Sequence, residues 1–179
     1  MGDLVSINTK VRTFIQGVLG LPIDRVRPSN QVGPVGQPSE NFATVFISEL
    51  GPVGSDVYQY NPDASIANNV LESILGTRSL MASVNFYKAG ALTLASRFHA
   101  LAFTSRAIAL LNAQNLGLYG ISRVRNLTAL IDTSWEERAQ IDIEIYLLSK
   151  ETVTLETYGS FPITATVGLL SVTKVETPP

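Results

Sequence analysis

The single histidine is the first residue to consider for acid–base chemistry, because its side chain titrates near neutral pH. His99 lies in a helical stretch, and no acidic residue stands four positions before or after it. A catalytic base needs an orienting partner, so we interpret His99 as a packing or surface residue. The chain has no cysteine, which excludes disulfides, thiolate metal sites and cysteine nucleophiles.

Two carboxylates could also do chemistry. Asp142 and Glu144 stand two residues apart on one side of a predicted strand, where they could act as an acid–base pair or as metal ligands. No further ligand cluster accompanies them, so a solvated or salt-bridged sheet face is the simpler interpretation. The chain also has no phosphate-loop, His-Glu-x-x-His or Gly-x-Ser-x-Gly sequence. The sequence therefore predicts no enzyme, no catalytic residue, no metal site and no cofactor.

The remaining polar cluster flanks a turn at 132–134. Its members are Arg123, Arg125, Glu136, Glu137 and Arg138, with Asp142 and Glu144 on the strand that follows. In one interpretation these residues form exposed cross-strand ion pairs, each of which contributes little to stability. In the other they form an interface between subunits, where arginine pairs fix orientation and register.

The strand that carries these carboxylates is the clearest element in the sequence. We predict this strand at 135–148, and from 139 onward apolar and polar residues alternate, which is the period of a half-buried β-strand. One predicted face holds Ala139, Ile141, Ile143, Ile145 and Leu147, and the other holds Gln140, Asp142, Glu144 and Tyr146. We expect the isoleucines to lie beneath a helix, in the core.

Two amphipathic helices are predicted, at about 4–19 and 91–112. In the first, apolar residues recur at spacings of three and four, and Gly17 or Gly20 can end it before Pro22. In the second, an apolar stripe runs beside several alanines, which would allow a sheet to approach closely. The pattern favours an α+β fold, with a mixed or antiparallel sheet packed by two helices.

Shorter patterns fill in the rest of the sheet. We expect a short strand at 26–27, a hairpin of strands 42–50 and 56–60 around a turn at 51–54, and strands at 80–87, 121–131 and 163–175. Residues 70–75 have helical spacing, but Gly76 would interrupt a long helix. The Pro/Gly-rich segment 28–39 is predicted to be a loop, either a contact loop or a bulge without a partner. Residues 176–179 form a short tail.

Composition limits the class of protein. The chain has 179 residues, of which 45% are hydrophobic and 16% charged, so it can bury a core as one domain over 1–179. The net charge of −2 gives no reason to expect a nucleic-acid-binding surface. We see neither a signal peptide nor a membrane-spanning run, and we expect a soluble protein made inside the cell.

Two blocks of sequence resemble the phage neck (tail) terminator family. One runs from Asn126-Leu127-Thr128 through Trp135-Glu136-Glu137-Arg138-Ala139-Gln140-Ile141-Asp142. The other is Ser79-Leu80-Met81-Ala82-Ser83-Val84-Asn85-Phe86-Tyr87, followed by a long helix. Their order and spacing over the C-terminal two thirds of the chain carry the resemblance. It favours a strand at 70–75 and an interface role for the polar cluster.

The resemblance implies a structural protein of the virion tail or neck, made in the host cytoplasm. Its partners would be other copies of itself in a ring, expected to be a hexamer, the tail tube protein and the neck or connector protein, with the tail sheath as a further candidate. DNA would pass through the lumen without being read, and no membrane would be involved. A tail-tube or head-completion protein is the alternative, since fold alone does not settle function. A small ligand-binding or enzymatic domain is the least favoured.

Overall fold

The computed structural model describes residues 4–29, 36, 38–65, 69–131, 134–156, 161–167 and 170–176. These residues form two compact units. Unit 1 comprises Met1–Ser55 with Gly76–Ser149, and unit 2 comprises Asp56–Leu75 with Lys150–Pro179. Most of the predicted loop 28–39 and the end of the predicted tail lie outside the described residues. That the whole chain is one domain stays a prediction.

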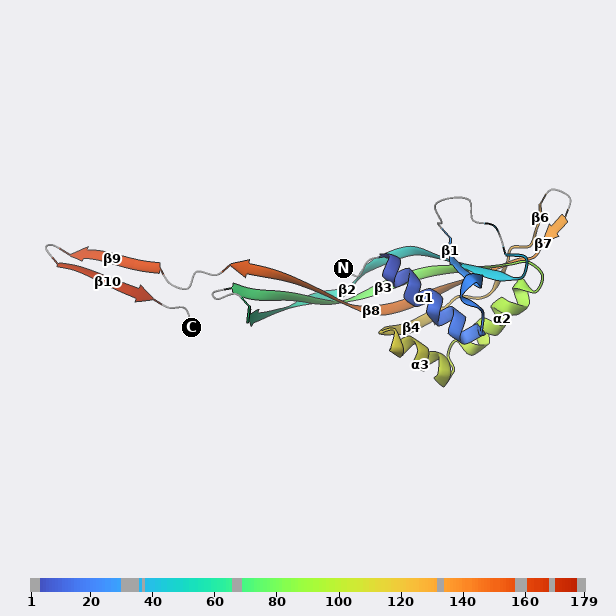
Figure 1. Cartoon of the computed structure of the whole chain (residues 1–179), viewed down its shortest axis with the longest axis horizontal. Coiled ribbons are helices and arrows are strands. Elements are labelled where there is room, and N and C mark those ends of the chain that lie inside the picture. Colours follow the sequence, from blue (N-terminus) through green and yellow to red (C-terminus); the bar gives the residue numbers. More distant parts are fainter. Residues whose placement is uncertain are drawn as a thin grey trace. The chain divides into compact units, whose positions relative to one another are not determined.

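A six-stranded sheet is the main β element of the described residues (Figure 1). Its strand order is β1 (Val26–Pro28), β2 (Phe42–Pro62), β3 (Asn69–Tyr87), β8 (Arg138–Glu156) and β4 (Leu116–Ile121), and β5 (Arg125–Asn126) also pairs with β8. Strand β1 runs parallel to β2, whereas β4 and β5 run antiparallel to β8. The predicted mixed α+β fold is therefore confirmed, including the strand at 70–75.

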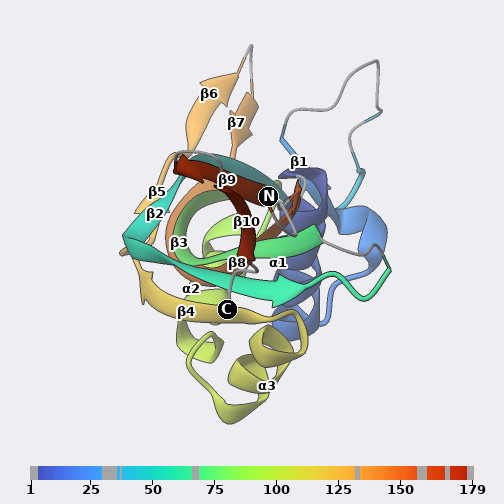
Figure 2. The ribbon, with the colours of Figure 1, turned by 90° about the vertical axis from the view of Figure 1, so that its left-hand side faces the viewer.

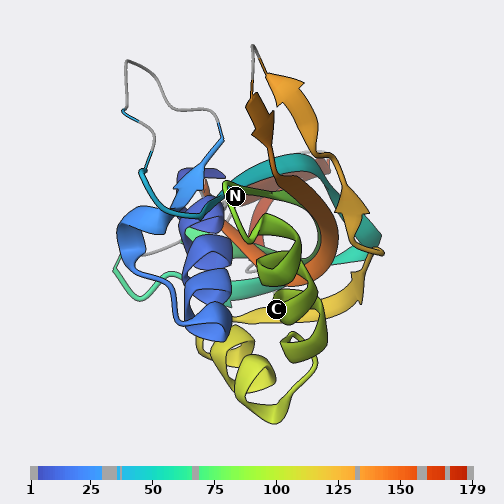
Figure 3. The ribbon, with the colours of Figure 1, turned by 90° about the vertical axis from the view of Figure 1, so that its right-hand side faces the viewer.

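Among the described residues of unit 1, three α-helices cover the sheet. They are α1 (Leu4–Leu19), α2 (Ala91–Leu101) and α3 (Ser105–Ala113), and a short 3₁₀ helix, η1 (Ile23–Arg25), precedes β1. Figure 3 shows α1 beside α2, with α3 at their end. Gly17 allows the close approach of α1 to α3, because a Cβ there would lie 2.8 Å from Leu110 Cδ1.

Helix α1 has the predicted bounds and ends at the predicted glycine. The N–H of Gly20 donates to the carbonyl of Gln16 at 2.7 Å, and Gly20 has a positive φ of 69°. Glycine adopts this left-handed conformation at little cost, which suits the position after a helix. Pro22 then prevents the helix from resuming.

The predicted second helix, 91–112, is two helices. After α2 the chain turns through 102–104, and the hydroxyl of Thr104 accepts a hydrogen bond from the Ala107 N–H, which caps α3. The same hydroxyl donates to the carbonyl of Leu101 at 2.7 Å. A threonine that satisfies backbone groups at both ends of a break stabilises the break, even though the apolar stripe continues through it.

The core of unit 1 lies between these helices and one face of the sheet. The rings of Phe14 and Phe98 meet edge to face at 5.9 Å, and Phe86 lies 6.3 Å from Phe98. The sheet contributes Ala139, Ile141, Ile143 and Ile145, all essentially without solvent exposure. The predicted inward face of β8 is confirmed for these residues, and each buried isoleucine contributes roughly 1.5–3 kcal/mol through burial.

The predicted hairpin at 42–60 is wrong, because β2 continues through the expected turn. Phe42 stacks on Tyr87, and Tyr60 donates to Glu72, so the partner numbers on β3 fall as those on β2 rise and the two strands are antiparallel. The expected turn residues Gly51, Pro52 and Gly54 instead lie within β2, where Gly54 departs from extended backbone with a φ of 73°. The reversal comes later, after Pro62.

Two further predicted strands are each divided. The strand predicted at 121–131 becomes the end of β4, then β5, then β6 (Ala129–Ile131), which pairs with β7 (Ser134–Glu136) in a separate hairpin. The strand predicted at 163–175 becomes the antiparallel hairpin of β9 (Phe161–Val167) and β10 (Leu170–Glu176) in unit 2. Shorter strands therefore replace both long strands.

Candidate interface surfaces

The open face of β8 carries a polar network centred on Asp142. Arg125 forms an ion pair with its carboxylate, the Ser83 hydroxyl donates to Oδ1 at 2.6 Å, and the Gln140 amide donates to Oδ1 at 3.2 Å. The network joins β3, β5 and β8, and register places Arg125 beside Gln140. The Arg125 side chain is 51% exposed and that of Asp142 is 22% exposed, so water screens this pair in part.

Glu137 has a different environment, at the N-terminus of α2. Its two carboxylate oxygens accept hydrogen bonds from the N–H groups of Gly90 and Leu92, each at 2.8 Å. The first N–H groups of a helix have no partner within the helix, and the helix dipole favours a negative charge at this end. A residue 45 positions away thus caps α2. Proximity along the chain gives no sign of this contact.

Arg138 lies on an aromatic pair. Its guanidinium carbon is 4.9 Å from the centre of the Tyr87 ring, and that ring stacks on Phe42 at 4.9 Å. A cation over an aromatic face is attracted by the ring quadrupole. Four of the seven predicted interface residues, Arg125, Glu137, Arg138 and Asp142, therefore make contacts within their own chain.

The other three predicted interface residues differ from these. Arg123 is exposed, and Glu136 and Glu144 are half-buried. None of the three forms an ion pair with another described residue. Tyr146, two residues after Glu144, lies 5.0 Å from the ring of Tyr119. Partial desolvation raises the pKa of Tyr146, and the nearby Tyr119 and Glu144 raise it further.

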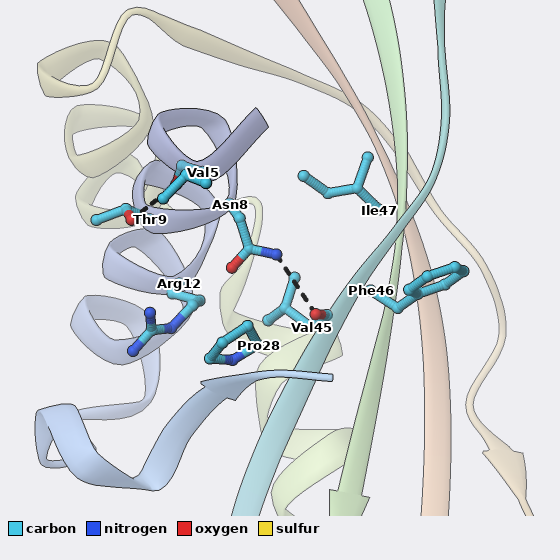
Figure 4. Close-up of a pocket in the computed structure, with 8 residues that line it drawn as sticks. All are labelled: Val5, Asn8, Thr9, Arg12, Pro28, Val45, Phe46 and Ile47. Carbon is cyan, nitrogen blue, oxygen red and sulfur yellow. Dashed lines mark hydrogen bonds between the residues drawn. The ribbon is translucent and has the colours of Figure 1, made fainter. Parts of the chain in front are cut away.

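A groove lies between α1 and β2 (Figure 4). Its cavity volume is about 330 Å³, and it is lined by Val5, Asn8, Thr9, Arg12, Pro28, Val45, Phe46 and Ile47. In Figure 4 Ile47 points back toward α1, whereas the Phe46 ring points away from it. Among the described residues no strand pairs with the outer edge of β2 beyond Val45. The groove therefore combines apolar side chains with a strand edge.

Large apolar side chains are exposed in both units. In unit 1 the β6–β7 hairpin exposes Leu130 and Trp135, which stand opposite each other. In unit 2 the ends of β2 and β8 expose Val57, Tyr58, Tyr60, Val153 and Leu155. Exposed apolar side chains that gather together are typical of surfaces that other molecules cover.

Nothing in the described part of the chain forms a cluster of His, Asp or Glu side chains suited to a metal ion. His99 is exposed on α2. No helix among the described residues is long and apolar enough to cross a membrane. The surfaces that stand out are thus apolar faces, a groove and strand edges, which are elements of protein–protein contact.

Comparison with protein families decides the identity. The sequence pattern of the phage neck terminator protein family matches residues 5–168. The chain belongs to this family. The match covers all of α1 after Leu4, the whole six-stranded sheet and β9, and it confirms the resemblance inferred from the two sequence blocks. A search of the curated proteins finds no match.

Membership gives this neck terminator a structural role in the phage neck, among other components of the tail and neck of the virion. Sequence reasoning missed the α1–β2 groove, because its walls are far apart in the sequence. It also missed the pairing of Leu130 with Trp135. The apolar residues around a short turn were a signal for that hairpin, but the strand predicted at 121–131 concealed it.

Proposed function

We propose that this neck terminator forms a homo-oligomeric ring that caps the finished tail tube and joins it to the neck connector. The ring is a hexamer in this proposal, and DNA passes through its lumen without sequence-specific contacts. Subunits are made in the host cytoplasm and join the virion at the end of tail assembly. The single observation that carries the proposal is the family match over 5–168.

Two features of the structure support an assembling protein. The chain exposes Trp135 and Leu130 in unit 1 and an apolar group around Tyr58 and Tyr60 in unit 2, and such surfaces are costly to leave in water. The outer edge of β2 offers backbone groups to which another strand can be added. A ring made of identical subunits repeats one contact at every subunit boundary, so it can bury such a surface on each subunit.

The candidate subunit-interface residues remain those predicted from the sequence. Arg123, Glu136 and Glu144 are the members of that set that form no ion pair within the described chain, so they are the ones most available to a neighbouring subunit. Charged pairs at the rim of an interface guide orientation and register more than they add affinity.

Electron microscopy and native mass spectrometry test the proposal together. The purified chain should form one closed ring with a fixed number of subunits, and particles assembled without it should have tails that do not join heads. A tail-tube protein would instead stack as many rings and occur in many more copies per virion. A chain that stays monomeric at every concentration would contradict the proposed ring. Particles whose heads and tails join in the absence of this protein would contradict the proposed role in joining them.

A further inference from the structure

The β6–β7 hairpin presents the most exposed large aromatic side chain of the described residues. Trp135 is 73% exposed and is the only tryptophan of the chain, and Leu130 opposite it is 58% exposed. Each strand of the hairpin pairs only with the other among the described strands. Figure 2 shows the hairpin at the top of the view, and its base lies near the start of α2, because Glu137, the residue after β7, accepts from the Leu92 N–H. Tryptophan anchors of this kind dominate the binding energy of many interfaces.

The α1–β2 groove is suited to receive an apolar side chain together with a carboxylate. Val45 and Ile47 belong to its apolar lining, and Arg12 is the only charged residue among the lining residues. The Arg12 Nε donates to the carbonyl of Val26 at 2.8 Å, but no described residue binds its two terminal nitrogens. Desolvation lowers the pKa of Arg12. A partly desolvated guanidinium with two free nitrogens favours a carboxylate partner.

The hairpin has the complementary charge. Residues 127–136 contain Asp132 and Glu136 but no lysine or arginine. The hairpin also extends from β5 and β8, whereas the groove lies at β2, on the other side of β3 in the strand order. The hairpin and the groove are two different patches, separated by β3 in the strand order. They suit a head-to-tail contact, which repeats and closes into a ring.

We propose that the β6–β7 hairpin of one subunit docks in the α1–β2 groove of the next, with Trp135 and Leu130 against the apolar lining of the groove. An acidic residue of the hairpin then meets Arg12. This inference rests on the proposed ring and identifies the contact that closes it. The occupant of the groove is a second copy of this chain.

Fluorescence of the intact protein gives a direct test, because Trp135 is the only tryptophan. Its emission should shift to shorter wavelength as rings form with rising concentration, since the indole leaves water. Rings that form without this shift would overturn the inference but would leave the proposed ring intact. A chain that never forms rings would overturn both.

Variants with matched controls test the two halves of the contact. Trp135→Ala should weaken subunit association at least roughly thirtyfold, as expected for an anchor residue. Phe103→Ala removes another exposed aromatic ring, 55% exposed, and should assemble normally.

Thr9→Tyr fills the groove and should also prevent assembly. Thr13→Tyr is its control, because both hydroxyls donate to the carbonyl four residues earlier at 2.9 Å, but Thr13 does not line the groove.

Mixing the two defective variants separates this contact from any other. Trp135→Ala retains a groove and Thr9→Tyr retains a hairpin, so a mixture can form one contact but cannot extend it. Native mass spectrometry should show two monomers that form a heterodimer and no ring. Absence of the heterodimer, or rings from either variant alone, would overturn the inference. Circular dichroism confirms that each variant is folded.

Discussion

The two ends of β8 have similar sequence patterns and opposite environments. At 139–145 every second residue is apolar and buried beneath the helices of unit 1. In unit 2, Val153 and Leu155 alternate with polar residues in the same way, yet both are exposed. The alternation shows that a face is apolar, but it does not show whether the cover comes from the same chain. In unit 2 no described helix provides that cover.

The largest expected effect comes from a charge in the covered half of β8. Ile143→Asp should destabilise the protein by at least about 3 kcal/mol or prevent folding, because an unpaired carboxylate would replace a fully buried side chain. Val153→Asp is the matched change in the exposed half and should alter the free energy of unfolding by no more than about 0.5 kcal/mol. Thermal melting followed by circular dichroism measures both. Equal melting of Ile143→Asp and the wild type would contradict the assignment of faces.

A medium effect is expected at the junction between sheet and helix. Glu137→Ala should cost about 1–2 kcal/mol, because the N–H groups of Gly90 and Leu92 lose a charged acceptor at the start of α2. Glu136→Ala removes a carboxylate that has no hydrogen bond or ion pair among the described residues, so it should cost less than about 0.5 kcal/mol. Urea denaturation distinguishes the two. Equal losses of unfolding free energy in the two variants would mean that the Glu137 cap adds nothing to stability.

A smaller effect separates contacts within a subunit from contacts between subunits. Arg125→Glu should cost up to about 1 kcal/mol, because it replaces a partly exposed ion pair with Asp142 by two like charges.

Arg123→Glu should leave the melting temperature unchanged. If Arg123 meets an acidic residue of the neighbouring subunit, the same variant should reduce the ring population at low salt, and added salt should soften the defect. If the double variant Arg123→Glu, Arg125→Glu forms as many rings as the wild type at low salt, both arginines are excluded from the interface.

The smallest effect is expected at the histidine. His99 is exposed, and its side chain forms no hydrogen bond or ion pair with a described residue. His99→Gln should therefore leave assembly and infectivity nearly unchanged. Plaque counts with the variant measure this. A severe loss of infectivity with the fold preserved would reveal an active role that the surroundings of His99 do not explain.

Sequence patterns were informative where one local rule decided the structure. The apolar period placed α1, and the alternation around Ile143 placed the core face of β8. At 51–54, however, the turn residues lie within β2, because β3 continues beside the strand and the glycines can be accommodated as an irregularity. At 102–104 the apolar stripe continues although the helix does not, since Thr104 satisfies backbone groups on both sides.

The candidate surfaces were harder to predict because they depend on distant pairings. The polar cluster was recognised as a group of charges, but its contacts within the chain were not. Glu137 reaches Gly90 only because β8 begins beside the end of β3, and the groove exists only because α1 lies along β2. Residue types at fixed spacing do not encode such contacts. The elements must be assembled before the contacts exist.

The irregularity in β2 has a consequence for the subunit before it meets its partners. A long, flat strand with a free edge is a template on which further chains add without limit, as in amyloid fibrils. Pro52 cannot donate a backbone hydrogen bond, and Gly54 turns the chain out of the extended conformation. The uninterrupted edge beyond Val45 is thereby short. In the proposed ring, such a short edge would disfavour open-ended strand addition while leaving backbone groups for a neighbouring subunit.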